Sequence, residues 1–208
     1  MLSVLVTNPK GGCGKTTIAT NLASAFAAGG QRCWLADVDR QRSSLHWLAR
    51  RPKTAPAINA LDWVKSLGKT PSKKGVMVID APAATKSKQT DALVGRADVV
   101  IVPVLPSAFD QETTAAFLRR LEDLKPIRKN KKAIGLLRNR VRRNSRAAMG
   151  LDLFMIGTGH RDLGVLPDRA VYPELASQGL GIFDLRTKFA ATLQQDWQAL
   201  LRFIIDPA

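Results

Sequence analysis

The chain has 208 residues, 45% of them hydrophobic, which is enough for one large core, so we predict a single domain over residues 1–208. Its 32 Lys and Arg residues against 17 Asp and Glu residues give a net charge of +15, which favours a polyanionic partner, nucleic acid or an anionic membrane, over a basic surface kept for solubility alone. Because it lacks an apolar run of roughly 18 residues, a basic signal region and a cysteine framework, we exclude membrane-spanning, secreted and disulfide-rich classes and expect a cytoplasmic protein.

Short apolar runs alternate with helical patterns along the whole chain. Strands are predicted at 2–7, 32–38, 75–82, 97–106, 132–141 and 162–170. Helices are predicted at 16–28, 43–51, 110–124, 145–156 and 184–204, with a further possible helix at 58–67. Because buried strands that alternate with helices form parallel sheets covered on both faces, the pattern predicts an α/β fold with a mostly parallel twisted sheet. Ligands of such folds bind at the carboxyl ends of the strands.

The first strand is followed by the segment NPKGGCGKTT at 8–17, which has the composition of a phosphate-binding loop. Its glycines let backbone N–H groups turn onto phosphate oxygens, and the start of the next helix adds a favourable dipole. Lys15 can neutralise the β- and γ-phosphates, and the Thr16 hydroxyl is placed to bind Mg²⁺. The standard loop begins with a glycine at the position of Pro9, and here Lys10 follows as a second lysine.

Carboxylates follow two further strands of the predicted sheet. Asp80 ends the third of these strands, as the metal-orienting Walker B carboxylate does, and turn capping is its alternative role. Asp37 and Asp39 are two residues apart, so we expect both on the same side of the sheet, with one near the metal and one polarising the attacking water. Asp39 is alternatively a helix cap. The segment 81–87 is expected to move when the γ-phosphate changes.

These motifs identify a family resemblance. KGGCGKTT, DVDRQRS and VIDAPAA resemble the deviant Walker A, Walker A′ and Walker B motifs of the ParA/MinD ATPases. VIVPVLPSAFD and LPDRAVYPELASQGLGIFD resemble later segments of the same family, so the likeness spans nearly the whole chain and best fits the short ParA type. The family often has proline where this chain has Arg40 and Ala83, so its switch loop is set differently.

The resemblance implies a P-loop NTPase fold and an ATPase that is weak without its partner. ATP and Mg²⁺ are the implied cofactors, two ATP molecules are sandwiched in a homodimer, and Lys10 reaches the partner copy's nucleotide. The implied catalytic residues are Lys10, Lys15 and Asp39. The implied metal site comprises Thr16, Asp37, Asp39 and Asp80. The implied nucleotide contacts are Lys10, Gly11, Gly12, Cys13, Gly14, Lys15, Thr16, Thr17, Asn139, Pro167 and Asp168, although Asn139 is alternatively a turn residue.

The same family implies non-specific DNA binding on the nucleoid and a ParB-like or cargo-adaptor protein that stimulates hydrolysis. Residues 119–146 carry twelve basic and two acidic residues, which favours phosphate-backbone contact over a merely solvated face. The predicted DNA contacts are Arg128, Lys129, Lys131, Lys132, Arg140, Arg142, Arg143 and Arg146, while Arg140 is alternatively near the nucleotide. The last helix carries one basic residue, Arg202, so we expect it to pack on the core and expect no membrane partner.

Three other functions remain open at this point. A MinD-like positioning ATPase would bind a membrane in place of DNA. An ATP-dependent ligase or synthase of the dethiobiotin or cobyrinate type shares the fold but needs a small-molecule pocket. A nitrogenase-reductase-like protein needs cluster-ligating cysteines, which Cys13 and Cys33 do not supply. The cargo, whether a plasmid, a chromosome, a chemoreceptor cluster or a carboxysome, is not encoded in these motifs.

Overall fold

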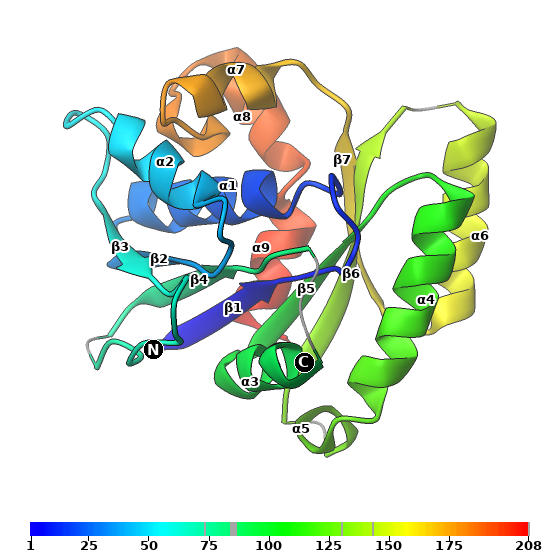
Figure 1. The fold of residues 1–208 in the computed structure, drawn as a ribbon. Coiled ribbons are helices and arrows are strands. Elements are labelled where there is room, and N and C mark those ends of the chain that lie inside the picture. Colours follow the sequence, from blue (N-terminus) through cyan, green and yellow to red (C-terminus); the bar gives the residue numbers. More distant parts are fainter. Residues whose placement is uncertain (73, 84–86, 130, 143, 208) are drawn as a thin grey trace.

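The computed structural model describes residues 1–72, 74–83, 87–129, 131–142 and 144–207, and its centre is a seven-stranded sheet in the order β3-β2-β4-β1-β5-β6-β7 (Figure 1). Every neighbouring pair of strands is parallel, which confirms the predicted α/β fold. The strands are β1 (Leu2–Val6), β2 (Cys33–Asp37), β3 (Ile58–Asp62), β4 (Val76–Asp80), β5 (Val99–Val104), β6 (Ala133–Val141) and β7 (Arg161–Pro167).

Helices cover both faces of the sheet because successive side chains of each strand point to opposite faces. In β1, Val4 and Val6 join one core while Leu5 joins the other, and all three are fully buried. The first core is covered by α1 (Lys15–Ala28), α2 (Ser43–Arg50), α7 (Val171–Ser177), the short η1 (Ile182–Asp184), α8 (Lys188–Gln195) and α9 (Gln198–Ile205). The second core is covered by α3 (Ser87–Arg96), α4 (Ala108–Glu122), α5 (Lys125–Arg128) and α6 (Arg146–Thr158).

Two secondary-structure predictions are wrong. Residues 58–62, assigned to a possible helix, form the edge strand β3, since each of them pairs in register with β2 from Cys33 to Asp37. The predicted single helix over 184–204 is divided into α8 and α9. At the junction the N–H groups of Asp196 and Trp197 bond to carbonyl groups three residues back, which tightens the turn and redirects the chain. Helices α3, α5 and α7 were not predicted.

The end of the chain packs on the core, as the sequence predicted. Leu193, Trp197, Leu200 and Ile204 are completely buried against the first core. Among the described residues no helix combines the length and the apolar character that crossing a membrane requires.

A buried ion pair joins the end of α2 to η1 and gives the first testable prediction. The Arg51 guanidinium donates to both oxygens of Asp184, at 2.8 and 2.6 Å, and the two side chains are only 5% and 3% exposed. Asp184 also accepts from the Ser24 hydroxyl. Arg51→Met leaves the carboxylate buried without its counter-ion, so we expect a loss of about 3–5 kcal/mol in the free energy of unfolding.

Urea denaturation tests this expectation, with Arg120→Met as the matched control. Arg120 pairs with Asp91 at 2.6 Å, but these side chains are 33% and 43% exposed. Solvent screens such a pair, so its removal should cost about 1 kcal/mol or less. Equal losses in the two variants would show that burial does not set the strength of the Arg51 pair.

Candidate nucleotide-binding site

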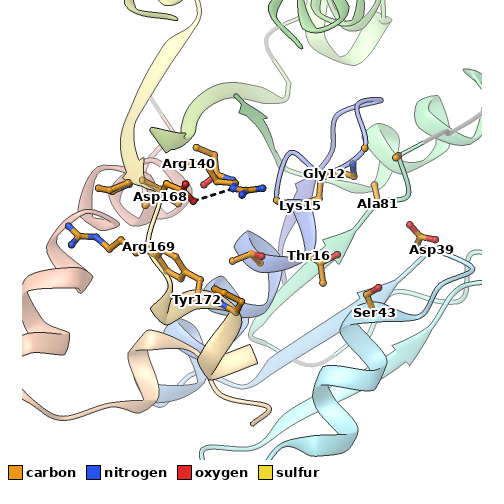
Figure 2. A pocket seen from close by; sticks show the side chains of 18 of the residues that line it. Gly12, Lys15, Thr16, Asp39, Ser43, Ala81, Arg140, Asp168, Arg169 and Tyr172 are labelled. Carbon is orange, nitrogen blue, oxygen red and sulfur yellow. Dashed lines mark hydrogen bonds and ion pairs between the residues drawn. The ribbon is translucent and has the colours of Figure 1, made fainter. Parts of the chain in front are cut away.

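A cavity of about 690 Å³ opens at the carboxyl edge of the sheet (Figure 2). Its walls come from the loops after β1, β2 and β4 on one side, and from the end of β6 and residues 166–173 on the other. This volume lies within the range of small-ligand sites, and the position is where parallel sheets bind ligands. The glycine loop, Asp39 and the segment after Asp80 thus meet around one space, as predicted.

The glycine loop is braced by β6. Gly12 and Gly14 have φ angles of +75° and +90°, which favour glycine, and a side chain at Gly14 would collide with the carboxamide of Asn139. Asn139 is itself buried and donates from Nδ2 to the Cys13 carbonyl at 2.8 Å. Helix α1 begins at Lys15 directly after the loop, so its free N–H groups form an anion-binding end.

The two lysines of the loop occupy different environments. Lys15 lines the cavity and is only 7% exposed, and its Nζ donates to the Lys10 carbonyl at 2.8 Å. Its Nζ also lies 3.7 Å from the Cys13 sulfur. Lys10 is half-buried, its backbone N–H donates to the Asn8 side chain, and it is absent from the described lining of the cavity. Lys15 therefore faces the cavity of its own chain, whereas Lys10 does not line it.

Asp80 is a buried carboxylate without a normal hydrogen-bond partner among the described residues, although it is only 1% exposed. Burial is the main cause that raises the pKa of Asp80 to about 7, the nearby Thr16 hydroxyl opposes the rise, and the charge of Asp37 adds to it. The buried Ser44 hydroxyl lies near Asp80 and also lowers the pKa of that carboxyl, although it makes no hydrogen bond of regular geometry among the described residues. A buried carboxylate between two hydroxyl groups fits a hydrated Mg²⁺, which prefers oxygen ligands and keeps several waters.

Asp37 and Asp39 have separate roles. Asp37 is fully buried, and its Oδ2 accepts from the N–H groups of Ser44 and Leu45 at 3.0 and 3.1 Å. The helix-capping role considered for Asp39 therefore belongs to Asp37, which caps α2 and also holds the Asp39 N–H at 2.9 Å. Asp39 is partly exposed and lines the cavity. Among the described residues no three acidic, His or Cys side chains form a metal cluster.

The opposite wall contains Asn139, Pro167 and Asp168, the residues assigned to the base side. Arg140 lies there too: its Nε is 3.3 Å from Asp168, and its φ of +54° accompanies a register shift between β6 and β7 (Figure 2). Such a bulge redirects a side chain, so a residue predicted to contact DNA faces the cavity. The wall also includes Arg169, Tyr172 and Trp197, which our motif search missed. The only sequence signal for Arg169 and Tyr172 is the run DRAVYP after the last strand, whereas Trp197 lies in the segment 184–204 that the sequence assigned to a core helix.

The basic segment does not form one surface. The α5 basic group, defined as Arg128, Lys129, Lys131 and Lys132, precedes β6, whereas the rim basic group, defined as Arg140, Arg142 and Arg146, follows or ends it (Figure 1). A nine-residue strand separates the groups by about 30 Å, at roughly 3.3 Å per residue. Arg143 lies outside the described residues, as do positions 84–86 of the expected switch segment. The arginine between the groups, Arg138, is held by Asp152 and Asp162.

The fold and the loop define a P-loop nucleotide-binding protein, and comparisons identify its family. The model of the CobQ/CobB/MinD/ParA nucleotide binding domain matches residues 4–182. Over 190 residues, 88% of this chain and 87% of the relative, the sequence is 30% identical to the maintenance of carboxysome distribution protein A of Halothiobacillus neapolitanus. The chain therefore belongs to the CobQ/CobB/MinD/ParA nucleotide-binding family, which confirms the ParA/MinD resemblance.

Solved structures agree with this fold. The apo structure of McdA from Cyanothece aligns with a TM-score of 0.76 at 15% identity, covering 97% of this chain and 98% of that one. A plasmid partition protein of Borrelia burgdorferi bound to AMPPNP aligns with a TM-score of 0.73 at 16% identity, with the same coverage of both chains.

Proposed function

We propose that this protein is a ParA-type ATPase that binds ATP with Mg²⁺, dimerises on it, and binds DNA as a dimer to position a cargo. A partner of the ParB-like or cargo-adaptor kind stimulates hydrolysis and so releases the dimer from the nucleoid. The observation that carries the proposal is the near full-length likeness to a relative named for carboxysome distribution, in a chain whose glycine loop, Asp39 and the segment after Asp80 surround one cavity. That likeness favours positioning over the ligase or synthase alternative.

Each residue of the site has a separate role in ATP binding and hydrolysis. The loop N–H groups and Lys15 bind the phosphates, and Thr16 and Asp80 hold Mg²⁺, which neutralises phosphate charge when it is bound. Asp39 orients the attacking water. Asp37 supports the site by fixing α2 and the Asp39 backbone.

The remaining contacts complete the nucleotide site. Asn139, Pro167 and Asp168 contact the base and ribose side of ATP, beside the Tyr172 ring. Lys10 is absent from the described lining of its own cavity and contacts the nucleotide of the partner copy. The site is then complete only in a dimer.

Arg142 and Arg146 of the rim basic group are the better candidates for DNA contact, because Arg140 faces the cavity. A dimer formed across the nucleotide edges brings the rim groups of both copies close together, so their combined charge depends on ATP. The α5 basic group lies about 30 Å away and would bind DNA in every nucleotide state. The core-packed end of the chain supports DNA over a membrane as the polyanionic surface.

Fluorescence anisotropy with a labelled DNA duplex, titrated at several salt concentrations, tests the proposal. We expect binding with ATP or a slowly hydrolysed analogue, little with ADP, and affinity that falls steeply with salt. Arg142→Glu with Arg146→Glu should weaken binding at least about tenfold, since each removed phosphate contact costs affinity and each added charge repels. Lys129→Glu with Lys131→Glu is the charge-matched control and should have a smaller effect. Binding that ignores the nucleotide, or no binding at all, would overturn the DNA proposal.

A further inference from the structure

The outer side of α6 is apolar and exposed. Met149, Leu153 and Ile156 are 67%, 73% and 81% exposed, and their spacing of four and three residues places them in one stripe along the helix. The same helix buries Leu151 and Met155 on its inner side, so its core contact is already satisfied without the stripe. We call the three exposed residues the α6 apolar face.

Exposed large hydrophobic side chains are concentrated here. Seven are found among the described residues, and the α6 apolar face supplies three of them. A fourth, Phe109, is 76% exposed on the first turn of α4, the helix that packs beside α6 (Figure 1). Single exposed apolar residues are ordinary, but an apolar stripe along one helix, with a further exposed aromatic residue on the adjacent helix, is typical of an interaction surface.

The charges around the face indicate the chemistry of its occupant. Arg146 is exposed on the first turn of α6, where the helix dipole adds positive potential. Arg142, four residues earlier in the loop before α6, is also exposed, although its Nε lies 3.3 Å from Asp168. The one acidic residue of the helix, Asp152, is paired with Arg138. An acidic partner is therefore attracted. A second copy of this chain also carries a charge of +15, so it would be repelled by the face. The face lies outside the nucleotide cavity, so no bound phosphate groups would offset this repulsion there.

Helix α4 contacts the start of the glycine loop, and β6, the strand that precedes α6, contacts the loop at Cys13. Thr114 of α4 accepts a hydrogen bond from the Asn8 side chain at 3.0 Å, at the start of the loop. The segment that leads into α6 begins at Asn139, which holds the Cys13 carbonyl. A partner that shifts α4 or α6 would act on the loop through these contacts.

We propose that the α6 apolar face, together with Phe109 on the adjacent helix α4, docks an amphipathic helix with acidic flanks carried by the partner protein. This inference rests on the proposed function, because it assigns a surface to the partner that stimulates hydrolysis. The apolar stripe of the partner helix packs on Met149, Leu153 and Ile156, and its acidic flank meets Arg142 and Arg146. Since those arginines also belong to the rim basic group, the docked helix competes with DNA.

A synthetic peptide tests the surface. The probe is a fluorescein-labelled, end-blocked 18-residue helix with leucine along one face and glutamate on both flanks. We expect it to bind the protein saturated with a slow ATP analogue, and Leu153→Ser or Ile156→Ser to weaken that binding at least tenfold. Phe189→Ser, which changes a 62% exposed side chain on α8, is the matched control and should not weaken it.

The outcomes separate this inference from the proposed function. The α6 variants should keep wild-type ATP binding and DNA binding in the absence of peptide, so a failure of the docking surface leaves those results unchanged. Equal binding of a scrambled peptide, or no loss in the α6 variants, overturns the docking proposal. Equal binding of a peptide with lysine in place of glutamate also overturns it. If the α6 variants have a lower light-scattering mass than the wild type under the same conditions, the face belongs to an interface with a second copy, and the docking proposal is wrong.

Discussion

Lys15→Ala should abolish measurable ATP binding while the protein remains folded. Lys15 is the loop lysine that lines the cavity, and it is only 7% exposed. Because water has little access to its ammonium group, we expect its interaction with the phosphates of ATP to be strong. Charge-assisted hydrogen bonds contribute about 1.5–3 kcal/mol each, so the loss of two such bonds weakens binding by roughly a hundredfold or more. Isothermal titration calorimetry with ATP and Mg²⁺ measures this loss directly.

Lys10→Ala is the matched control for that experiment. It removes the same charge from the same loop, but Lys10 lies outside the described cavity lining, so ATP affinity under conditions that keep the protein monomeric should change less than Lys15→Ala changes it. Circular dichroism checks that both variants are folded. If Lys15→Ala bound ATP as well as the wild type, the assignment of the two lysines would be wrong.

Asp80 should make the protein without metal less stable as the pH rises. The pKa of Asp80 is raised from 3.8 to about 7 by burial, so its protonated form is favoured in the folded state. Its stabilising contribution is complete below the unfolded pKa and is lost as the pH rises through about 7. Between pH 5 and 8.5 this loss amounts to about 3 kcal/mol, because each unit of pKa shift corresponds to roughly 1.4 kcal/mol.

Asp80→Asn isolates that effect, since the amide does not titrate. In urea denaturation without Mg²⁺, the difference in stability between variant and wild type should move in favour of the variant as the pH rises from 5 to 8.5. A constant difference across that range would mean that Asp80 titrates like an exposed carboxylate.

Binding of Mg²⁺ and ATP should also release a proton near pH 7, because a bound cation favours the ionised carboxylate. Calorimetry in two buffers of different ionisation enthalpy counts the protons. Asp80→Asn should release fewer protons than the wild type, and an unchanged count would place the proton elsewhere.

Local sequence signals predicted the centre of this protein well. The parallel sheet could be predicted because buried apolar strands alternate with helices. The loop at 8–17 could be predicted because its glycines permit the backbone conformation that phosphate binding requires. Asp80 could be located because a strand end fixes its position on the sheet edge. These features depend on residues that are close together in the sequence.

The remaining features depend on contacts between distant segments. β3 is a strand because β2 offers it a pairing edge, and no pattern within 58–62 encodes that. Asp37 caps α2 through residues seven and eight positions further on, and Arg140 reaches the cavity through a bulge between β6 and β7. The twelve basic residues looked like one surface because the sequence does not reveal that β6 carries the chain across the whole sheet.

The central claim is that the loop with two lysines forms a complete site only when two copies share their nucleotides. The mass in solution, measured by light scattering with ADP and then with a slow ATP analogue, tests it most directly. We predict a mass near the 22.7 kDa of one chain with ADP and twice that mass with the analogue, whereas Lys10→Ala should bind the analogue and stay monomeric. A Lys10→Ala protein that dimerises like the wild type, or a wild-type mass that does not respond to the nucleotide, would contradict the account.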